Sequence, residues 1–170
     1  MSQTAPKAHV RLAETRDLDA VVLMTESRRI QYQEYQPVFW RKAKDSTEQA
    51  YEFLEKLLTW DKAVFLVSEQ AGKVNGFLVA TEVKAPPVYD PQGATYQVDD
   101  FCVISPDLWL VAGRPLLAET RRRVRERGAV QIVVVCGDRD IAKAELLRRE
   151  KLSIASNWWT QPLCDRPLMM

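Results

Sequence analysis

Histidine and cysteine are scarce in this chain of 170 residues, and their scarcity argues against several kinds of site. The three cysteines, Cys102, Cys136 and Cys164, form no close pair, and their odd number does not suit a disulfide framework. The single histidine, His9, has no ligand partner at metal spacing. We therefore expect neither a zinc site nor any other bound metal.

Long hydrophobic runs and an excess of one charge are also lacking. The longest apolar runs, such as residues 132–136, are far too short to span a bilayer, and residues 1–8 lack the apolar core of a signal peptide. The 24 Lys and Arg against 23 Asp and Glu give a formal net charge of +1, so no global field draws the chain to nucleic acid or anionic membrane. These absences predict a cytoplasmic protein with no nucleic-acid partner and no membrane partner.

Hydrophobic residues make up 46% of the sequence, enough for a substantial core, and the length fits a single domain over residues 1–170. No internal repeat or linker divides the chain. Periodicity and turn residues predict strands at 10–14, 63–69, 74–82, 98–103, 129–136 and 152–159, and helices at 17–35, 47–60, 115–127 and 141–150. The triplet Ala71-Gly72-Lys73 is typical of a hairpin turn between the second and third strands.

The most informative stretch, residues 98–136, has the pattern of strand, loop, helix and strand. Pro115 suits the first helical position and Gly128 a C-terminal cap, and a helical crossover within one sheet makes the two strands parallel. The loop at residues 108–114 offers backbone N–H groups and the positive end of a helix dipole to an anion such as a pyrophosphate. A turn glycine without any ligand is the alternative interpretation of Gly113.

This order of elements resembles the GNAT superfamily of acyl-CoA-dependent N-acyltransferases over nearly the whole chain. Residues 10–17 are similar to its opening strand and first helix start, residues 76–79 to its third strand, and residues 113–117 to the end of its Gln/Arg-x-x-Gly-x-Gly/Ala signature. The resemblance implies an α/β (α+β) fold with a mixed, mostly antiparallel twisted sheet, a central parallel strand pair and flanking helices. It also implies acetyl-CoA or another acyl-CoA as cofactor, and a small-molecule amine as acceptor.

The resemblance also assigns cofactor-binding residues. It implies that the backbone of Phe101, Cys102, Val103 and Ile104 addresses the acyl group, that Val111, Ala112, Gly113 and Arg114 hold the pyrophosphate, and that Asp140 replaces an asparagine that contacts the cofactor. The signature is degenerate, because Leu108 and Val111 stand in place of Gln or Arg and the first glycine. Leu147 stands where the family often has the tyrosine that protonates the leaving thiolate.

Acyl transfer from a thioester to an amine needs a polarised carbonyl, a deprotonated amine and a thiolate that can leave. Asp99 and Asp100 lie where members of the family often place a general base, and desolvation of the one that faces the core would raise its pKa. Tyr96, on the same strand, is a candidate acid or substrate contact. The alternatives are two solvated carboxylates and a half-buried structural tyrosine.

Three further features each have two interpretations. Cys102 lacks a histidine nearby in sequence, which favours a small buried thiol over a nucleophile. The arginines at 121–127 contact either the 3′-phosphate of coenzyme A or solvent alone. The aromatic residues at 32–40 and 158–159 line an acceptor pocket, or they pack in the core or against a second copy in a homodimer.

These observations predict an acyl-CoA-dependent N-acyltransferase. The degenerate signature keeps open a catalytically impaired acyl-CoA-binding module of the same fold. An interaction or oligomerisation domain without a cofactor is the third alternative.

Overall fold

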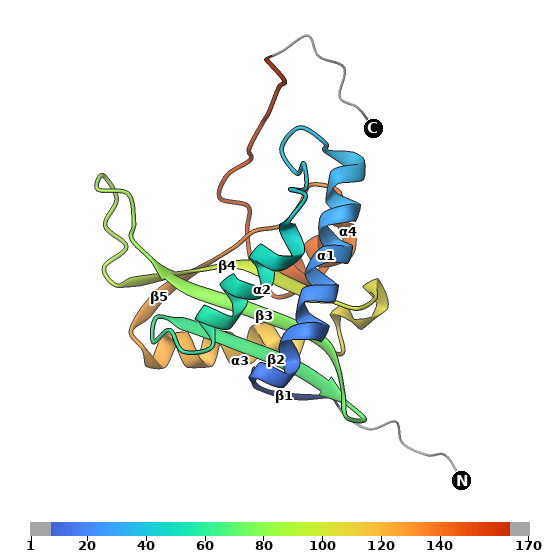
Figure 1. Cartoon of the computed structure of the whole chain (residues 1–170). Coiled ribbons are helices and arrows are strands. Elements are labelled where there is room, and N and C mark those ends of the chain that lie inside the picture. The colour runs from blue at the N-terminus through green and yellow to red at the C-terminus, as the bar shows by residue number, and fades with distance from the viewer. Residues whose placement is uncertain (1–7, 164–170) are drawn as a thin grey trace.

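The computed structural model describes residues 8–163, which form a five-stranded sheet with helices on both faces (Figure 1). The strands are β1 (His9–Leu12), β2 (Ala63–Gln70), β3 (Lys73–Val83), β4 (Ala94–Val103) and β5 (Ala129–Val134). The helices are α1 (Leu18–Tyr35), α2 (Ser46–Leu57), α3 (Gly113–Glu126) and α4 (Ile141–Arg149), with short 3-10 helices η1 (Thr15–Asp17) and η2 (Pro106–Trp109). Cys164 lies outside the described residues.

The strands follow one another in the order β1-β2-β3-β4-β5. The first four are antiparallel neighbours, whereas β4 and β5 are parallel, with Ala94 opposite Ala129 and Val98 opposite Val134. Helix α3 is the crossover that joins the parallel pair, which confirms the prediction from residues 98–136. The mixed, mostly antiparallel sheet is therefore the one that the sequence predicts.

The predicted last strand at residues 152–159 is wrong. In the structure this segment has no strand and leads away from the sheet after α4 (Figure 1). Ile154 and Trp159 are 72% and 93% exposed, so neither side of the segment is buried as a sheet strand requires. Because nothing is added beside β5 within residues 8–163, the parallel pair lies at the edge of the sheet and not at its centre.

The sheet separates two hydrophobic cores, because successive residues of each strand point to opposite faces. Helices α3 and α4 cover one face and pack on Leu66, Leu78 and Phe101, whereas α1 and α2 cover the other face and pack on Phe65 and Phe77. Figure 1 shows this arrangement, with α1 and α2 over one face and α3 over the other. Burial of both faces explains why β2 and β3 are nearly continuous apolar runs.

Local signals at the turns are also confirmed. Ala71 and Gly72 have φ of 51° and 75°, the left-handed pair that a two-residue hairpin turn requires. Gly128 has φ of 83° and ends the helical crossover, as predicted for a C-terminal cap. No helix within residues 8–163 combines the length and apolar character needed to cross a membrane.

A buried ion-pair cluster anchors the start of α1 to the sheet. Arg11 of β1 donates to Asp17 and to Glu69 of β2, each at 2.7 Å. The Asp17 carboxylate also accepts a 2.8 Å hydrogen bond from the Glu14 N–H. These ion pairs fix the first turn of α1 to β1 and β2. The partners include residues far apart in the sequence, so local sequence patterns do not predict the contact.

Candidate active site

Strand β4 carries a bulge at Asp99 and Asp100. Leu78 of β3 pairs with Phe101 and Ala80 pairs with Val98. The single residue Val79 between them therefore lies opposite both aspartates. A bulge bends the strand and changes the direction of its side chains, and bulges recur beside active sites. The two residues predicted as candidate bases therefore lie at the irregular point of the sheet.

The parallel strands stop pairing where this bulge begins. Their last partners are Val98 and Val134, followed by a 2.9 Å hydrogen bond from the Val135 N–H to the Val98 carbonyl. Beyond it, residues 99–103 of β4 have no strand on this side within the described part of the chain. We call the opening between residues 99–103 and the end of β5 the β4–β5 notch.

Asp100 is held by an arginine that is not among the residues predicted from the sequence. Arg28 of α1 donates from Nη2 to Asp100 Oδ1, and from Nη1 to the Asp99 carbonyl oxygen at 3.3 Å. The side chains of Arg28 and Asp100 are only 14% and 13% exposed. Arg28 lies between Thr25 and Tyr32 on the buried face of α1. A charged residue at a position where the helix pattern calls for an apolar one is the sequence signal that could have identified it.

Asp99 differs from its neighbour in having no hydrogen bond or ion pair to its carboxylate among residues 8–163. The side chain reaches solvent, but desolvation by the surrounding protein raises its pKa, and the negative charge of Asp100 adds to this effect. Arg28 and Lys143 oppose the rise without cancelling it. An unpaired carboxylate with a raised pKa is suited to accept a proton.

Tyr96 is not brought together with these aspartates. Its side chain is 2% exposed and belongs to the core between the sheet and α3, together with Val98 and Phe101. Asp100 pairs with Arg28 of α1, on the opposite face. The geometry thus favours the structural interpretation of Tyr96.

The loop before α3 has fewer unpaired backbone N–H groups than the sequence predicts. The N–H groups of Val111 and Ala112 already donate to the Leu108 carbonyl, at 3.1 and 2.8 Å. Helix α3 begins two residues earlier than predicted, and within the described chain the N–H groups of Gly113 and Arg114 have no acceptor. The anion site at this helix end is therefore narrowed to these two donors.

Gly113 also has a packing role. A Cβ at this position would lie 2.5 Å from Cε3 of Trp109 and 3.2 Å from Cδ2 of Leu146. The ring of Trp109 therefore covers the α-carbon of Gly113 beneath the loop. The neighbouring Arg114 extends outward, where its Nε pairs with Glu150 at 2.7 Å.

The predicted acyl-binding segment follows the bulge directly. Phe101, Cys102 and Val103 are buried, whereas Ile104 is 59% exposed and donates its N–H to the Asn75 carbonyl at 3.0 Å. The backbone of residues 99–103 faces the β4–β5 notch and thus provides the edge that the predicted pantetheine needs.

Cys102 packs beneath α1, with its Sγ 3.8 Å from the Met24 carbonyl. Burial raises the pKa of this thiol, which keeps it protonated and poorly nucleophilic. The structure therefore supports the small buried thiol and not the nucleophile.

Asp140 caps α4. Its Oδ1 accepts from the Lys143 N–H at 3.3 Å, and its Oδ2 accepts from the Tyr32 hydroxyl at 2.8 Å. Both carboxylate oxygens are thus engaged in joining α4 to α1. A contact from Asp140 to a cofactor remains a prediction.

Lys143 is the most unusual charged residue near the notch, and the sequence patterns did not indicate it. Its side chain is fully buried, and Nζ donates to the Phe101 carbonyl at 3.2 Å. The ammonium lies 5.4 Å from the Phe101 ring centroid and 5.9 Å from that of Trp109. Burial, together with the positive charge of Arg28, lowers the pKa of Lys143 to about 8.

A pocket of about 530 Å³ opens beside Asp99 and Asp100. Aromatic rings form much of its wall, and their centroids are 5.2 Å apart for Tyr32 and Trp40 and 4.6 Å apart for Phe39 and Trp40. Trp158, from the segment after α4, contacts Phe39 at 5.9 Å. Other lining side chains include Arg28, Arg29, Arg41 and Phe53. The predicted aromatic residues therefore gather next to the candidate base.

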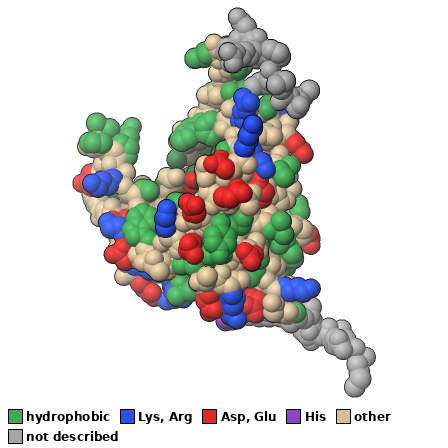
Figure 2. All heavy atoms as spheres, viewed as in Figure 1, with side chains coloured by type: hydrophobic (Ala, Val, Ile, Leu, Met, Phe, Trp, Pro, Cys, Tyr) green, Lys and Arg blue, Asp and Glu red, His purple; other side chains and the backbone are tan. Residues whose placement is uncertain are grey.

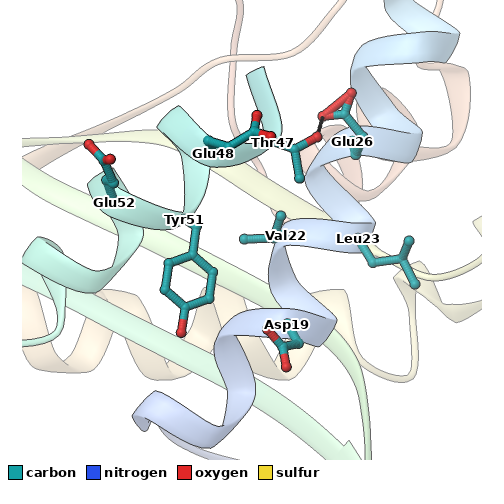
Figure 3. A pocket seen from close by; sticks show the side chains of 8 residues that line it. All are labelled: Asp19, Val22, Leu23, Glu26, Thr47, Glu48, Tyr51 and Glu52. Atoms are coloured by element: carbon teal, nitrogen blue, oxygen red, sulfur yellow. Dashed lines mark hydrogen bonds between the residues drawn. The ribbon is translucent and has the colours of Figure 1, made fainter. Parts of the chain in front are cut away.

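A second hollow, of about 690 Å³, lies between α1 and α2. Its lining residues are Asp19, Val22, Leu23, Glu26, Thr47, Glu48, Tyr51 and Glu52. Figure 3 shows Tyr51 extending from α2 into the space between the helices. Acidic, basic and hydrophobic side chains are mixed over this face (Figure 2), and no cluster that could hold a metal ion occurs within residues 8–163. This hollow does not include Asp99 or Asp100, the candidate bases on β4.

The arginines of α3 are largely engaged in ion pairs. Arg121 pairs with Glu150 at 3.0 Å, and Arg122 and Arg123 each pair with Glu119 at 2.7 Å. Helix-surface pairs of this kind support a charged, solvated face. This interpretation is favoured over a dedicated phosphate site.

The chain has the GNAT fold, which solved acetyltransferase structures share over more than 90% of its length. A predicted acetyltransferase with acetyl-CoA from Clostridium acetobutylicum is 13% identical, with a TM-score of 0.70, covering 92% of this chain and 96% of that one. An aminoglycoside N-acetyltransferase in complex with CoA is 10% identical, with a TM-score of 0.70, covering 96% and 100%. A mutant Bacillus halodurans protein is 15% identical, with a TM-score of 0.80, covering 92% and 99%. No family model and no curated protein matches the sequence.

Proposed function

We propose that this protein is an acyl-CoA-dependent N-acyltransferase that transfers an acetyl or other acyl group to the amine of a small molecule in the cytoplasm. The observation that carries the proposal is the bulge of β4, which positions Asp99 and Asp100 at the β4–β5 notch and beside a pocket lined with aromatic rings. The shared fold with acetyltransferases supports it.

The chain has two features that fit an acyl-CoA. The free N–H groups of Gly113 and Arg114 at the start of α3 would hold phosphate oxygens, and the open edge at residues 99–103 would hold the extended pantetheine arm. When bound, the cofactor supplies a thioester carbonyl that an amine can attack. Val111 and Ala112 would contribute to the shape of the site, because their N–H groups are already used.

Asp99 is the proposed base. Within the described residues its carboxylate has no hydrogen-bond or ion-pair partner, whereas the Asp100 carboxylate pairs with Arg28 and so helps to hold the bulge. Desolvation raises the pKa of Asp99, which makes its carboxylate a better acceptor for a proton from an ammonium group.

The acceptor would occupy the 530 Å³ pocket next to Asp99. Tyr32, Phe39 and Trp40 provide flat apolar surfaces, which suit an amine that carries an aromatic or aliphatic group.

An acyl-CoA-binding module without turnover is the second candidate. The observation that favours it is Leu147, which is 9% exposed and offers no proton where related proteins often carry a tyrosine. This candidate predicts cofactor binding without thiol release.

The test begins with thermal unfolding of the purified protein with and without acetyl-CoA, followed by thiol release against a panel of amines. Asp99→Asn should keep the thermal shift and reduce thiol release by about 100-fold or more, as expected for loss of a general base. Asp61→Asn, an exposed carboxylate in the turn before β2, is the matched control and should release thiol normally.

The outcomes separate the alternatives. A thermal shift without thiol release for any amine would support the binding module. No shift with acetyl-CoA or longer acyl-CoAs would overturn the proposal and support an interaction domain without a cofactor. Normal release by Asp99→Asn would remove Asp99 from the mechanism.

A further inference from the structure

Lys143 is a buried cation without a counter-ion. Its side chain has no exposed surface, and among residues 8–163 no carboxylate lies within ion-pair distance of Nζ. Within residues 8–163, Nζ contacts the Phe101 carbonyl oxygen and the faces of the Phe101 and Trp109 rings. Burial of an unpaired charge is costly, so a lysine at this position is a poor choice for stability alone.

The position of the ammonium connects it to the proposed reaction. Phe101 follows the bulge directly, and within residues 8–163 no strand pairs with this part of β4 on the β5 side. Lys143 lies one helical turn before Leu147 on the buried side of α4, so the two residues share a face. The nitrogen therefore lies near the segment that would align the acyl group, on the helix from which Leu147 provides no proton.

We propose that Lys143 is the acid that protonates the departing thiolate of coenzyme A. This inference rests on the proposed acyl transfer and supplies the proton donor that Leu147 does not provide. Arg28 also reaches the segment, at the Asp99 carbonyl, but a guanidinium does not deprotonate in the working pH range. Tyr96 is packed in the core beneath α3.

The step balances in protons and electrons. Asp99 takes one proton from the acceptor ammonium, and the free amine nitrogen forms a bond to the acyl carbon. That nitrogen loses its second proton to solvent, and the carbon–sulfur bond breaks with its electron pair on sulfur, which leaves a neutral amide and a thiolate. One N–H bond of Lys143 then breaks and an S–H bond forms. Lys143 regains a proton from solvent, and Asp99 returns its proton to solvent, so the chain ends as it began.

The surroundings of Lys143 tune it for this role. Burial and Arg28 of α1 lower its pKa, whereas Asp140 at the start of α4, Cys136 after β5 and Cys102 of β4 raise it. The result, a pKa of about 8, lies close to the ordinary value of about 8.5 for a thiol. Proton transfer between groups of similar pKa is efficient in either direction.

The first experiment is a pH–rate profile of thiol release with the best amine. The wild type should lose activity as the pH rises through about 8, because Lys143 loses its proton. Lys143→Met and Lys143→Arg should be about 100-fold slower and should lack this alkaline decline. Lys73→Met, at the exposed first residue of β3, is the control and should keep the wild-type profile.

The second experiment measures binding without turnover. The ultraviolet absorbance of the thiolate gives the pKa of free coenzyme A bound to the protein, and a nearby ammonium should lower that pKa in the wild type. In Lys143→Met the bound thiol should titrate at a higher pH than in the wild type. Circular dichroism of each variant confirms the fold, and loss of a buried unpaired charge is not expected to unfold it.

The outcomes distinguish the two proposals. If coenzyme A binds and thiol release proceeds, but both the alkaline decline and the bound-thiol pKa are unchanged in Lys143→Met, the role of Lys143 is wrong and the acyl transfer stands. If the wild type binds no coenzyme A, the proposed function fails, and the role of Lys143 fails with it.

Discussion

The hydroxyl of Tyr32 donates a 2.8 Å hydrogen bond to the carboxylate of Asp140, a residue 108 positions later in the chain. The same hydroxyl accepts from the Gly137 N–H at 3.3 Å. A Cβ at Gly137 would lie 2.0 Å from the Tyr35 hydroxyl oxygen, so the backbone approaches α1 very closely. The end of α1 thereby holds the connection between β5 and α4, which forms one side of the β4–β5 notch.

Removal of this hydroxyl should loosen the connection. Tyr32→Phe should lower the free energy of unfolding by about 2 kcal/mol, because a hydrogen bond to a charged group is lost and a buried carboxylate oxygen loses a donor. Urea denaturation measures the change. Tyr89→Phe, whose side chain is 72% exposed, should be neutral; equal stability of Tyr32→Phe and wild type would contradict the structural role.

The Arg11–Asp17 pair should make stability depend on acid pH. Desolvation raises the pKa of Asp17, but the hydrogen bonds from Arg11 and the Glu14 N–H, with the charge of Arg11, together lower it below its ordinary value. Its contribution is therefore complete above the unfolded pKa of about 3.9 and is lost as the pH falls through the lower folded value.

Asp17→Asn should accordingly cost about 3 kcal/mol at pH 7, since it leaves the partly buried Arg11 without one of its two carboxylate partners. The difference from the wild type should shrink below about pH 4. Denaturant unfolding at several pH values measures it. A difference that stays constant down to pH 2 would show that the charge of Asp17 is not responsible.

Gly113 is expected to be required for packing as well as for any anion. Gly113→Ala should destabilise the protein by about 1 kcal/mol, because the new methyl group would displace the ring of Trp109. The penalty should largely disappear in the background of Trp109→Leu, which removes the ring. A double-mutant cycle with no coupling between the two positions would contradict this contact.

Arg28 should set the pH range of activity. Its charge lowers the pKa of both Asp99 and Lys143, so Arg28→Met should shift the acid and alkaline limbs of the pH–rate profile to higher pH. The maximum rate should also fall, because Asp100 loses its partner and the bulge is less well held. Arg16→Met, at an exposed pair with Glu14, is the control. An unchanged profile would show that Arg28 does not act on the reacting groups.

Local patterns were sufficient for most elements of the fold. The apolar runs of β2 and β3, the turn at Ala71 and Gly72, and the helix that ends before Gly128 each depend on residues close in sequence. A helical crossover between strands of one sheet then requires β4 and β5 to be parallel. Residues 152–159 have a similar alternation, but a strand also needs a neighbour and a buried face, and neither is present there.

The candidate site was predicted in part. Asp99 and Asp100 were identified because the family resemblance places a general base at this point of the strand, and both residues lie at the bulge. The partnership of Asp100 with Arg28 spans 72 residues, and that of Lys143 with Phe101 spans 42. In both contacts a charged side chain lies on a helix face that otherwise packs in the core. The sequence shows this irregularity in the helix pattern, but it does not show which residue the charged side chain contacts.

The sequence by itself thus determined the order of the elements, the parallel pair and the presence of carboxylates on β4, because periodicity and turn chemistry act over a few neighbouring residues. Only the tertiary structure decided which aspartate is free, which loop N–H groups remain unpaired, and that a lysine lies against the Phe101 carbonyl. Hydrogen-bond partners and pKa values depend on which side chains, distant in sequence, are buried together. In a buried environment a single added charge or hydrogen bond is enough to change a pKa.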